Sequence, residues 1–171
     1  FFLTHTHSDH FSDLADLHLN AWITQNRTDK LKVYGPEGTQ SVTDGFEATY
    51  ALDYKWRYEH HGNIVAPIEF AGFDTHIIDI ESSIVIEDND LKVTAFLVKH
   101  DPVKPSIGYR FDYKGRSITI SGDTSYSENL IKHADKTDLL FHEALSYKLN
   151  NAGATAALRV DETGNISTVL I

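Results

Sequence analysis

The sequence predicts an α+β fold in which helices pack outside two sheets. Two observations predict this class. Apolar residues recur with helical spacing along the first third of the chain, whereas apolar and polar residues alternate in the segments from Ile77 onward. A chain of 171 residues, 41% of them hydrophobic, is long enough for one compact domain with a core. We therefore expect a single domain over residues 1–171.

The spacing predicts two long helices, one from about Phe11 to Trp22 and one from Glu37 to about His61. Ser8 or Asp9 can cap the first. The other expected elements are a strand over 31–34, strands over 83–87, 92–98, 107–113 and 117–121, a helix over 126–134, a strand over 138–141, and a closing hairpin over 156–160 and 166–171. Turn residues at 88–90 and 114–115 predict two further hairpins.

Aromatic residues recur at spacings of four along the second helix. They are Phe46, Tyr50, Tyr54 and Tyr58. Residues at this spacing lie on one face of a helix, and such a face most often packs into the core. A platform on which a substrate ring stacks is the alternative interpretation.

The densest group of metal-ligand residues is the loop His5-Thr6-His7-Ser8-Asp9-His10, which directly follows an apolar stretch. Imidazole nitrogens and carboxylate oxygens are ligands of zinc and neighbouring metals. If the loop is extended, His5, His7 and Asp9 line one side and His10 the other, which predicts two adjacent metals. The alternative is a set of surface histidines or a purification tag, but tags are usually uninterrupted histidine runs.

Further polar residues follow predicted strands. His100 comes after the strand over 92–98, and Asp123 follows Gly122 after the strand over 117–121. Strand ends suit ligands because the strand fixes the position and the loop leaves an opening. Asp123 has a second interpretation as the cap of the following helix, but Ser125 can fill that role.

His142 and Glu143 close another apolar strand. They are candidates for a catalytic role or for a supporting role in which Glu143 orients an imidazole. A merely structural role is the alternative. The histidines without this strand-end context are interpreted as surface or core residues: His18, His60, His61, His76 and His133.

Charge and composition restrict the function. The chain has 15 basic and 25 acidic residues and a formal net charge of −10, which argues against binding of nucleic acid, including tRNA. The absence of cysteine excludes disulfides and thiolate ligands. No apolar run approaches the roughly 20 residues that span a bilayer, so we expect no membrane partner. Compartment stays open, with the cytoplasm preferred, and a homo-oligomer is compatible with the sequence.

These motifs carry a resemblance to a known family. The histidine loop, His100, Gly122-Asp123-Thr124 and His142-Glu143-Ala144 occur in the order typical of the metallo-β-lactamase superfamily. With Gly108-Tyr109-Arg110-Phe111 after His100, the chain looks like the branch that holds ribonuclease Z and related hydrolases. The resemblance covers residues 1 to about 147.

The resemblance implies an αββα sandwich of two mixed sheets, with helices on the outer faces and a dinuclear metal site at the sheet edge. Two divalent ions are implied, usually zinc, although manganese or iron tolerates the same ligands. The implied ligands are His5, His7 and His100 for one metal and Asp9 and His10 for the other, with Asp123 bridging. The metals would activate a water molecule, and Asp9 would orient it or accept its proton.

Two departures from the family pattern lead to further expectations. The family has strands before the histidine loop and a last histidine ligand well after the His-Glu-Ala element, but no histidine follows His142. We therefore expect the N-terminal strands to be missing from this chain, and residues to be missing after about 147. If the last ligand is truly absent, a non-catalytic metal-binding scaffold becomes the better interpretation.

The expected activity is metal-dependent hydrolysis of an ester-type bond in a small molecule: a phosphodiester, a sulfate ester or a lactone. The alternative is cleavage of tRNA at its 3′ end, as the resemblance to ribonuclease Z implies. Many such enzymes grip tRNA with a basic, glycine-rich arm, which the segment between Gly35 and Gly72 does not resemble. For this reason, and because of the net charge, the sequence favours the small ester.

Overall fold

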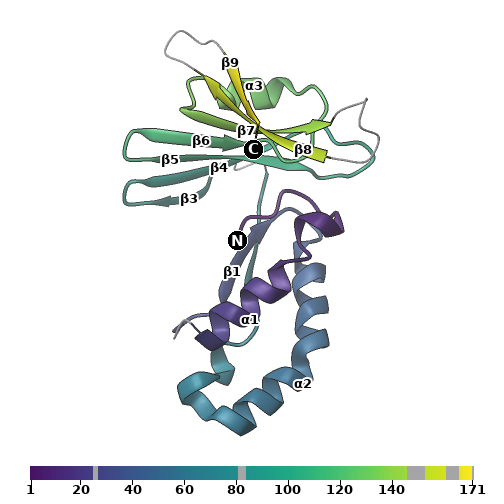
Figure 1. Cartoon of the computed structure of the whole chain (residues 1–171), viewed down its shortest axis with the longest axis vertical. Coiled ribbons are helices and arrows are strands. Elements are labelled where there is room, and N and C mark those ends of the chain that lie inside the picture. The colour runs from purple at the N-terminus through teal and green to yellow at the C-terminus, as the bar shows by residue number, and fades with distance from the viewer. Residues whose placement is uncertain (25–26, 81–83, 146–152, 161–165, 171) are drawn as a thin grey trace. The chain divides into compact units, whose positions relative to one another are not determined.

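The computed structural model describes residues 1–24, 27–80, 84–145, 153–160 and 166–170 (Figure 1). The chain divides into two compact units, Phe1–Ile77 and Ile78–Ile171. The single domain expected from the sequence stays a prediction. Within these described residues, no helix combines the length and the apolar character that crossing a bilayer requires.

The first unit is a two-stranded parallel sheet with helices packed against it. Its elements are η1 (Ser8–His10), α1 (Leu14–Thr24), β1 (Leu31–Gly35), α2 (Thr39–Val65), η2 (Ile68–Phe70) and β2 (Phe73–Ile77). The register of β1 and β2 runs from Leu31↔Phe73 to Gly35↔Ile77. Parallel strands need a long crossover, and α2 supplies it.

The core of this unit forms where α1 and α2 meet the sheet. Leu14, Val33 and Phe73 are buried together, with Phe46 packed against them. Trp22, Tyr54 and Ala66 form a second buried cluster, with Tyr50 packed on it. Core packing is therefore confirmed for three of the four aromatic residues on α2. It is wrong for Tyr58, which is 39% exposed and belongs to neither cluster.

A buried histidine joins the two helices to the start of β2. His18 is 1% exposed, and its Nε2 accepts hydrogen bonds from the backbone N–H of Gly72 and from the hydroxyl of Tyr54, both at 3.1 Å. Burial lowers the pKa of His18, since the charged form would lose its solvation and both hydrogen bonds. The interpretation of His18 as a core residue is confirmed.

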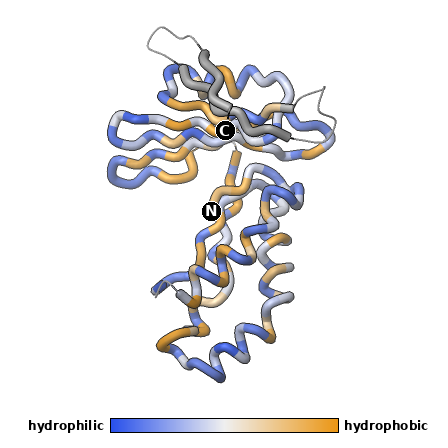
Figure 2. The backbone as a smooth tube through the Cα atoms, viewed as in Figure 1, coloured by the Kyte–Doolittle hydropathy of each residue, from blue (hydrophilic) through white to orange (hydrophobic). Residues whose placement is uncertain are grey.

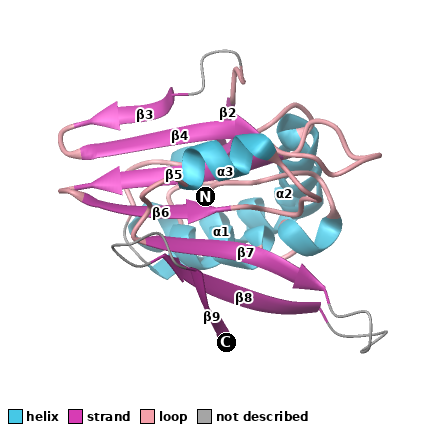
Figure 3. Ribbon diagram, turned by 90° about the horizontal axis from the view of Figure 1, so that it is seen from above, coloured by secondary structure: helices cyan, strands magenta, loops and turns pink. Residues whose placement is uncertain are grey.

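In its described residues, the second unit is a seven-stranded mixed sheet with one helix (Figure 3). Its elements are β3 (Ile84–Asp88), β4 (Leu91–Leu97), β5 (Ile107–Tyr113), β6 (Arg116–Ile120), α3 (Glu128–Ala134), β7 (Leu139–Leu145), β8 (Gly153–Val160) and β9 (Ile166–Leu170), and the strands lie side by side in chain order. All neighbours are antiparallel except β6 and β7, which are parallel and connected through α3. The tips of the β3–β4 and β5–β6 hairpins are hydrophilic (Figure 2).

One face of this sheet is covered by α3. Leu130 of α3 is buried with Phe96 of β4 and Leu140 of β7. Arg110 on β5 fastens the end of the helix, because its Nη1 donates to the carbonyls of His133 (2.7 Å) and Asp135 (2.8 Å). The helix therefore has a fixed position over the strands that end near Asp123.

The predicted α+β class, with two sheets and helices, is confirmed, as are the hairpins at 88–90 and 114–115. Asn89, Lys114 and Gly115 have the positive φ angles that tight hairpins favour. The closing hairpin is also confirmed as β8 and β9, although residues 161–165 and 171 lie outside the described part. Residue 83, where a strand was predicted to begin, and residues 146–152, near which missing residues were expected, also lie outside it.

Two local predictions are wrong, and one strand was not predicted. Neither Ser8 nor Asp9 caps α1, because both lie in η1 and the helix begins only at Leu14. Ser125 does not cap α3 either, since the hydroxyl of Ser127 accepts the hydrogen bond from the N–H of Leu130. Strand β2 was not predicted, because Asp74, a residue type uncommon in strands, interrupts its short apolar pattern.

We expect opposite effects of alanine at two glycines of α2. Gly45 lies inside the helix, and an added Cβ meets no atom within 4 Å, so Gly45→Ala should raise the free energy of unfolding by about 0.5–1 kcal/mol. Gly62 has φ 65° and ψ −172°, a conformation essentially restricted to glycine, so Gly62→Ala should lower it by about 1–3 kcal/mol. Urea denaturation of both variants checks this. Shifts in the same direction would contradict the non-helical conformation of Gly62.

Candidate metal centre

The histidine loop of the first unit begins beside β1. The N–H of Leu3 donates to the carbonyl of Tyr34 at 2.8 Å, and the N–H of Tyr34 donates to the carbonyl of Phe1 at 2.9 Å. Phe2 and Tyr34 thus form a parallel bridge, and Leu3 is 1% exposed. Pairing and burial fix the chain just before His5, so the ligand loop starts from a rigid strand-like segment.

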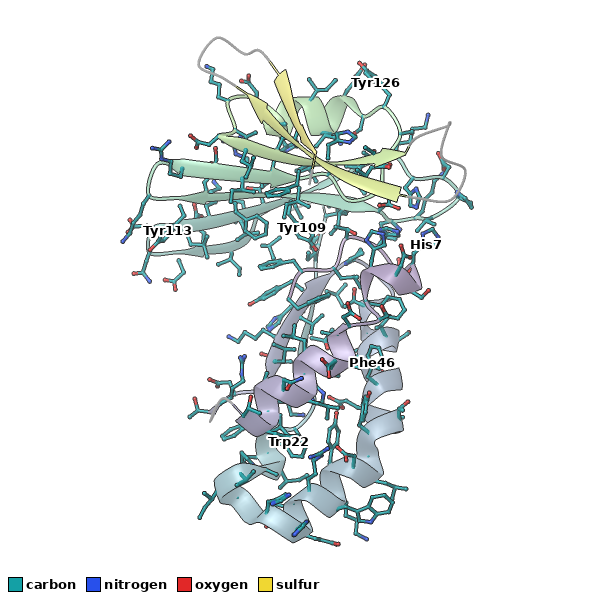
Figure 4. The ribbon with its side chains drawn as sticks, in the orientation of Figure 1. His7, Trp22, Phe46, Tyr109, Tyr113 and Tyr126 are labelled. Carbon is teal, nitrogen blue, oxygen red and sulfur yellow. The ribbon has the colours of Figure 1, made fainter. Side chains whose placement is uncertain are left out.

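Three imidazoles come together on this loop. The ring centroid of His5 lies 4.8 Å from that of His7 and 4.2 Å from that of His10. Nε2 of His5 lies 3.1 Å from Nδ1 of His7, and Nε2 of His10 lies 3.4 Å from Oδ2 of Asp9. His5 is buried, whereas His7, labelled in Figure 4, and Asp9 are exposed. The loop therefore concentrates nitrogen ligands with a carboxylate at their margin.

The sequence-based geometry of this loop is wrong in one respect. An extended run through Asp9 would place His10 on the side opposite His5, but the chain turns into η1 at Ser8, and the N–H of His10 donates to the carbonyl of His7 at 3.1 Å. The turn brings the His10 ring back beside His5. All three histidines of the loop are thus neighbours.

The second unit carries another pair of ligand-type side chains. His100 follows β4 and Asp123 follows β6, and these two strands run in the same direction because each is antiparallel to β5. Both residues therefore leave the sheet at the same edge. Nε2 of His100 lies 3.9 Å from Oδ2 of Asp123, and both side chains are partly exposed. A cation at this pair would meet one nitrogen and one oxygen donor.

The turn that carries Asp123 is fastened on both sides. On one side, Ser121 is hydrogen-bonded to β7, because its N–H donates to the carbonyl of Phe141 at 2.9 Å. On the other side, the N–H of Ser125 donates to the carbonyl of Lys99 at 2.7 Å, and Thr124 Oγ1 accepts from the N–H of Lys99 at 3.1 Å. Since Lys99 directly precedes His100, the same bonds fix the two candidate ligands relative to one another.

In the hydrogen bonds that the structure shows, the Glu143 side chain contacts this turn and not an imidazole. Its Oε1 accepts from the N–H of Thr124 at 2.9 Å, and its own N–H donates to Ser121 Oγ at 3.1 Å. The neighbouring His142 is partly buried, and its Nδ1 lies 2.6 Å from the carbonyl oxygen of Glu143. Glu143 is therefore placed to hold the backbone beside Asp123.

Ser121 and Thr124 were missed as contributors to the site. Both are buried and hydrogen-bonded within the turn. The signal was present in the sequence, because hydroxyl residues flanking a glycine commonly fasten a turn through their side chains.

The histidines assigned no ligand role lie elsewhere in the two units. His76 lies 3.1 Å from Asp74 Oδ2 and stacks on Tyr34, and His133 stacks on Phe96. His60 and His61 are exposed and stack on each other. Their surface or packing interpretation is in agreement with these contacts.

The donor types fit a divalent metal of the zinc class. Imidazoles from the loop, an imidazole and carboxylate at the strand edge, and a carboxylate at Asp9 are the nitrogen and oxygen ligands that zinc, manganese and iron accept. Each of His5, His7, His100 and Asp123 has a side-chain atom of a type that binds metal ions. The chain contains no thiolate that would favour softer metals.

Curated relatives share the ribonuclease Z name. The ribonuclease Z of Mycolicibacterium gilvum (strain PYR-GCK) is 28% identical over 152 residues, which cover 88% of this chain and 51% of the relative. That of Mycobacterium sp. (strain KMS) is 30% identical over 145 residues, covering 84% of this chain and 49% of the relative. The chain thus spans about half the length of the curated relatives it matches.

Two solved structures share the fold. Human tRNase Z, short form, superposes with a TM-score of 0.59 at 25% identity, covering 86% of this chain and 58% of that one. The metallo-β-lactamase fold protein YhfI from Bacillus subtilis gives a TM-score of 0.55 at 16% identity, covering 81% of this chain and 47% of that one, and it shows the fold alone. A family model described as a beta-lactamase superfamily domain matches residues 1–166. With its strand-end histidines and aspartates, the chain belongs to the metallo-β-lactamase superfamily and is ribonuclease Z-like.

Proposed function

We propose that the chain is the metal-binding part of a hydrolase that cleaves a phosphodiester in RNA, at the 3′ end of tRNA precursors. The observation that carries the hydrolase assignment is the set of ligand-type residues at strand ends, three clustered imidazoles in one unit and the His100–Asp123 pair in the other. The RNA substrate is supported by the relatives that are named ribonuclease Z.

This order of candidates reverses the preference drawn from the sequence. The small ester was favoured because of the charge of −10, but the named relatives support the tRNA alternative better. The charge still favours a small phosphodiester, sulfate ester or lactone as the second candidate, since an acidic surface repels a polyanion. Bound divalent cations oppose that repulsion locally.

We assign two divalent ions to the centre, with zinc preferred and manganese or iron compatible. The proposed ligands are His5, His7 and His100 for one ion and Asp9 and His10 for the other, with Asp123 bridging. When bound, such a pair supplies an activated water and stabilises charge on the leaving oxygen. The assignment requires the two units to bring their ligands together.

The side chains have separate roles in this proposal. Asp9 is 78% exposed and lies beside His10, so its carboxylate is accessible to orient a water molecule or accept its proton. Glu143 is a positioning residue, because it holds the N–H of Thr124 next to Asp123. His142, at the same strand end, is proposed as a further catalytic group that contacts the substrate.

Several predictions about the whole molecule are retained as proposals. We infer that both units form one domain, which is supported by a family model that runs across both. A homo-oligomer and a cytoplasmic location stay predictions. A non-catalytic scaffold is the outcome to consider if metal binds without activity.

Incubation of the metal-reconstituted protein with a precursor tRNA carrying a 3′ trailer tests the proposed activity. We expect release of the trailer by one cut, abolished by a chelator and restored by zinc or manganese. Parallel assays use an aryl phosphodiester, an aryl sulfate and a lactone. Hydrolysis of one of these without cleavage of RNA would replace the proposal with the second candidate. Full metal occupancy without any hydrolysis would favour the scaffold.

Asp123→Ala should remove metal from both positions, because a bridging carboxylate serves both ions. The loss of activity should exceed the roughly 10–100-fold that removal of a residue supporting a ligand costs. Elemental analysis per folded chain and turnover are measured together. His76→Ala is the matched control and should retain both, since His76 has no ligand role. Two metals and full turnover in Asp123→Ala would refute the bridging assignment.

Two substitutions separate a positioning role of Glu143 from a catalytic one. Glu143→Ala removes the acceptor of the Thr124 N–H and should lower metal affinity and turnover by roughly 10–100-fold. Glu143→Gln keeps an acceptor oxygen and should recover most of both. If glutamine is as damaging as alanine to turnover while metal affinity stays normal, Glu143 acts in proton transfer instead.

A further inference from the structure

The histidine loop forms one wall of an open pocket that has no assigned role. The pocket has a volume of about 600 Å³ and lies within the first unit, between the loop and the first half of α2. Its lining residues are Thr6, Phe11, Gly38, Ser41, Val42, Gly45, Phe46 and Thr49. Pockets for small organic groups typically fall in this size range, roughly 300–1,000 Å³.

The lining is aromatic and uncharged. The rings of Phe11 and Phe46 lie 6.2 Å apart at an interplanar angle of 74°. Both phenylalanines are partly buried, Phe46 against the core, so each ring keeps only part of its surface exposed in the pocket. Hydroxyl groups come from Thr6, Ser41 and Thr49, and that of Thr49 donates to the carbonyl of Gly45 at 2.8 Å, which leaves its oxygen as an acceptor.

The pocket is continuous with the candidate metal ligands through the chain itself. Thr6 stands between His5 and His7, and its methyl group lies 3.1 Å from the position of a Cβ added to Gly38. The loop and the start of α2 therefore lie close together at this point. A group bound in the pocket lies against the residue that separates the two histidines.

We propose that this pocket receives the nucleobase that flanks the scissile phosphate of an RNA substrate. The inference rests on the proposed function, which it extends to a base-binding subsite. With no charged residue in its lining, the pocket suits an uncharged ring rather than a phosphate, which would stay in water or at the metals. A base also stacks on phenyl rings and exchanges hydrogen bonds with hydroxyls, whereas an aliphatic group uses only the apolar surface.

Gly45 allows the pocket to be filled by a single substitution. It lines the pocket in an ordinary helical position, and a Cβ added there meets no atom within 4 Å. A leucine at this position projects on the same stripe as Ser41 and Thr49, one helical turn away on either side. Gly45→Leu therefore occupies the space without a backbone clash. Ala51→Leu adds a leucine at an exposed position of the same helix that does not line the pocket, and it is the matched control.

The test compares cleavage of intact RNA with that of RNA lacking the base on one side or the other of the cut. In the unsubstituted protein, removal of the base that occupies the pocket should lower kcat/KM by about tenfold, the effect of losing one base stacked on an aromatic side chain. In Gly45→Leu this ratio should fall towards one, while Ala51→Leu keeps it. Two results would overturn the subsite. One is an unsubstituted protein whose kcat/KM does not change when either base is removed. The other is a Gly45→Leu variant with the same ratio of kcat/KM for intact and abasic RNA as the unsubstituted protein.

Failure of the subsite is distinguishable from failure of the RNA substrate. If no RNA is cleaved, saturation-transfer NMR with adenosine measures binding of the ring directly. Binding that is present in the unsubstituted protein and in Ala51→Leu but lost in Gly45→Leu supports the pocket as a ring site even without RNA cleavage. Absence of adenosine binding overturns it, whatever the protein hydrolyses.

Discussion

The hydrogen bond from the Thr124 N–H to the carboxylate of Glu143 is the interaction on which the strand-edge half of the site depends. It is 2.9 Å long, and a second bond joins Glu143 to the same turn, from the Glu143 N–H to the Ser121 hydroxyl. Bonds to an ionised acceptor are among the stronger hydrogen bonds in proteins. Together they close the turn around Gly122 and Asp123, so the aspartate is held in place before any metal binds.

That constraint works because of the strand order. The β6 and β7 strands are parallel, so the turn after β6 and the residues of β7 near its end reach the same edge of the sheet. The bonds to Lys99 then join the turn to the end of β4, beside His100. Ligand-type residues distant in sequence are thus positioned by hydrogen bonds that main-chain N–H groups donate to carbonyls and to the side chains of Glu143, Ser121 and Thr124.

Much of this arrangement was predictable from the sequence. The hairpins were predictable because turn residues such as Asn89 and Gly115 separate alternating strands, and the histidine loop stood out because its ligand-type residues are adjacent. The features that the sequence did not predict depend on short turns or on hydrogen bonds between residues far apart in the sequence. The η1 turn that brings His10 beside His5 has no strong signal, and the Glu143–Thr124 bond joins residues 19 positions apart.

We propose that His5 and His7 of one unit and His100 of the other bind a common metal, with Asp123 as the carboxylate ligand. X-ray absorption at the zinc edge, on protein loaded with one equivalent of zinc, tests it most directly. The account predicts scattering from three imidazoles with oxygen donors, and loss of one imidazole in His100→Ala. An unchanged spectrum in that variant, or a zinc surrounded only by oxygen, would contradict the shared centre.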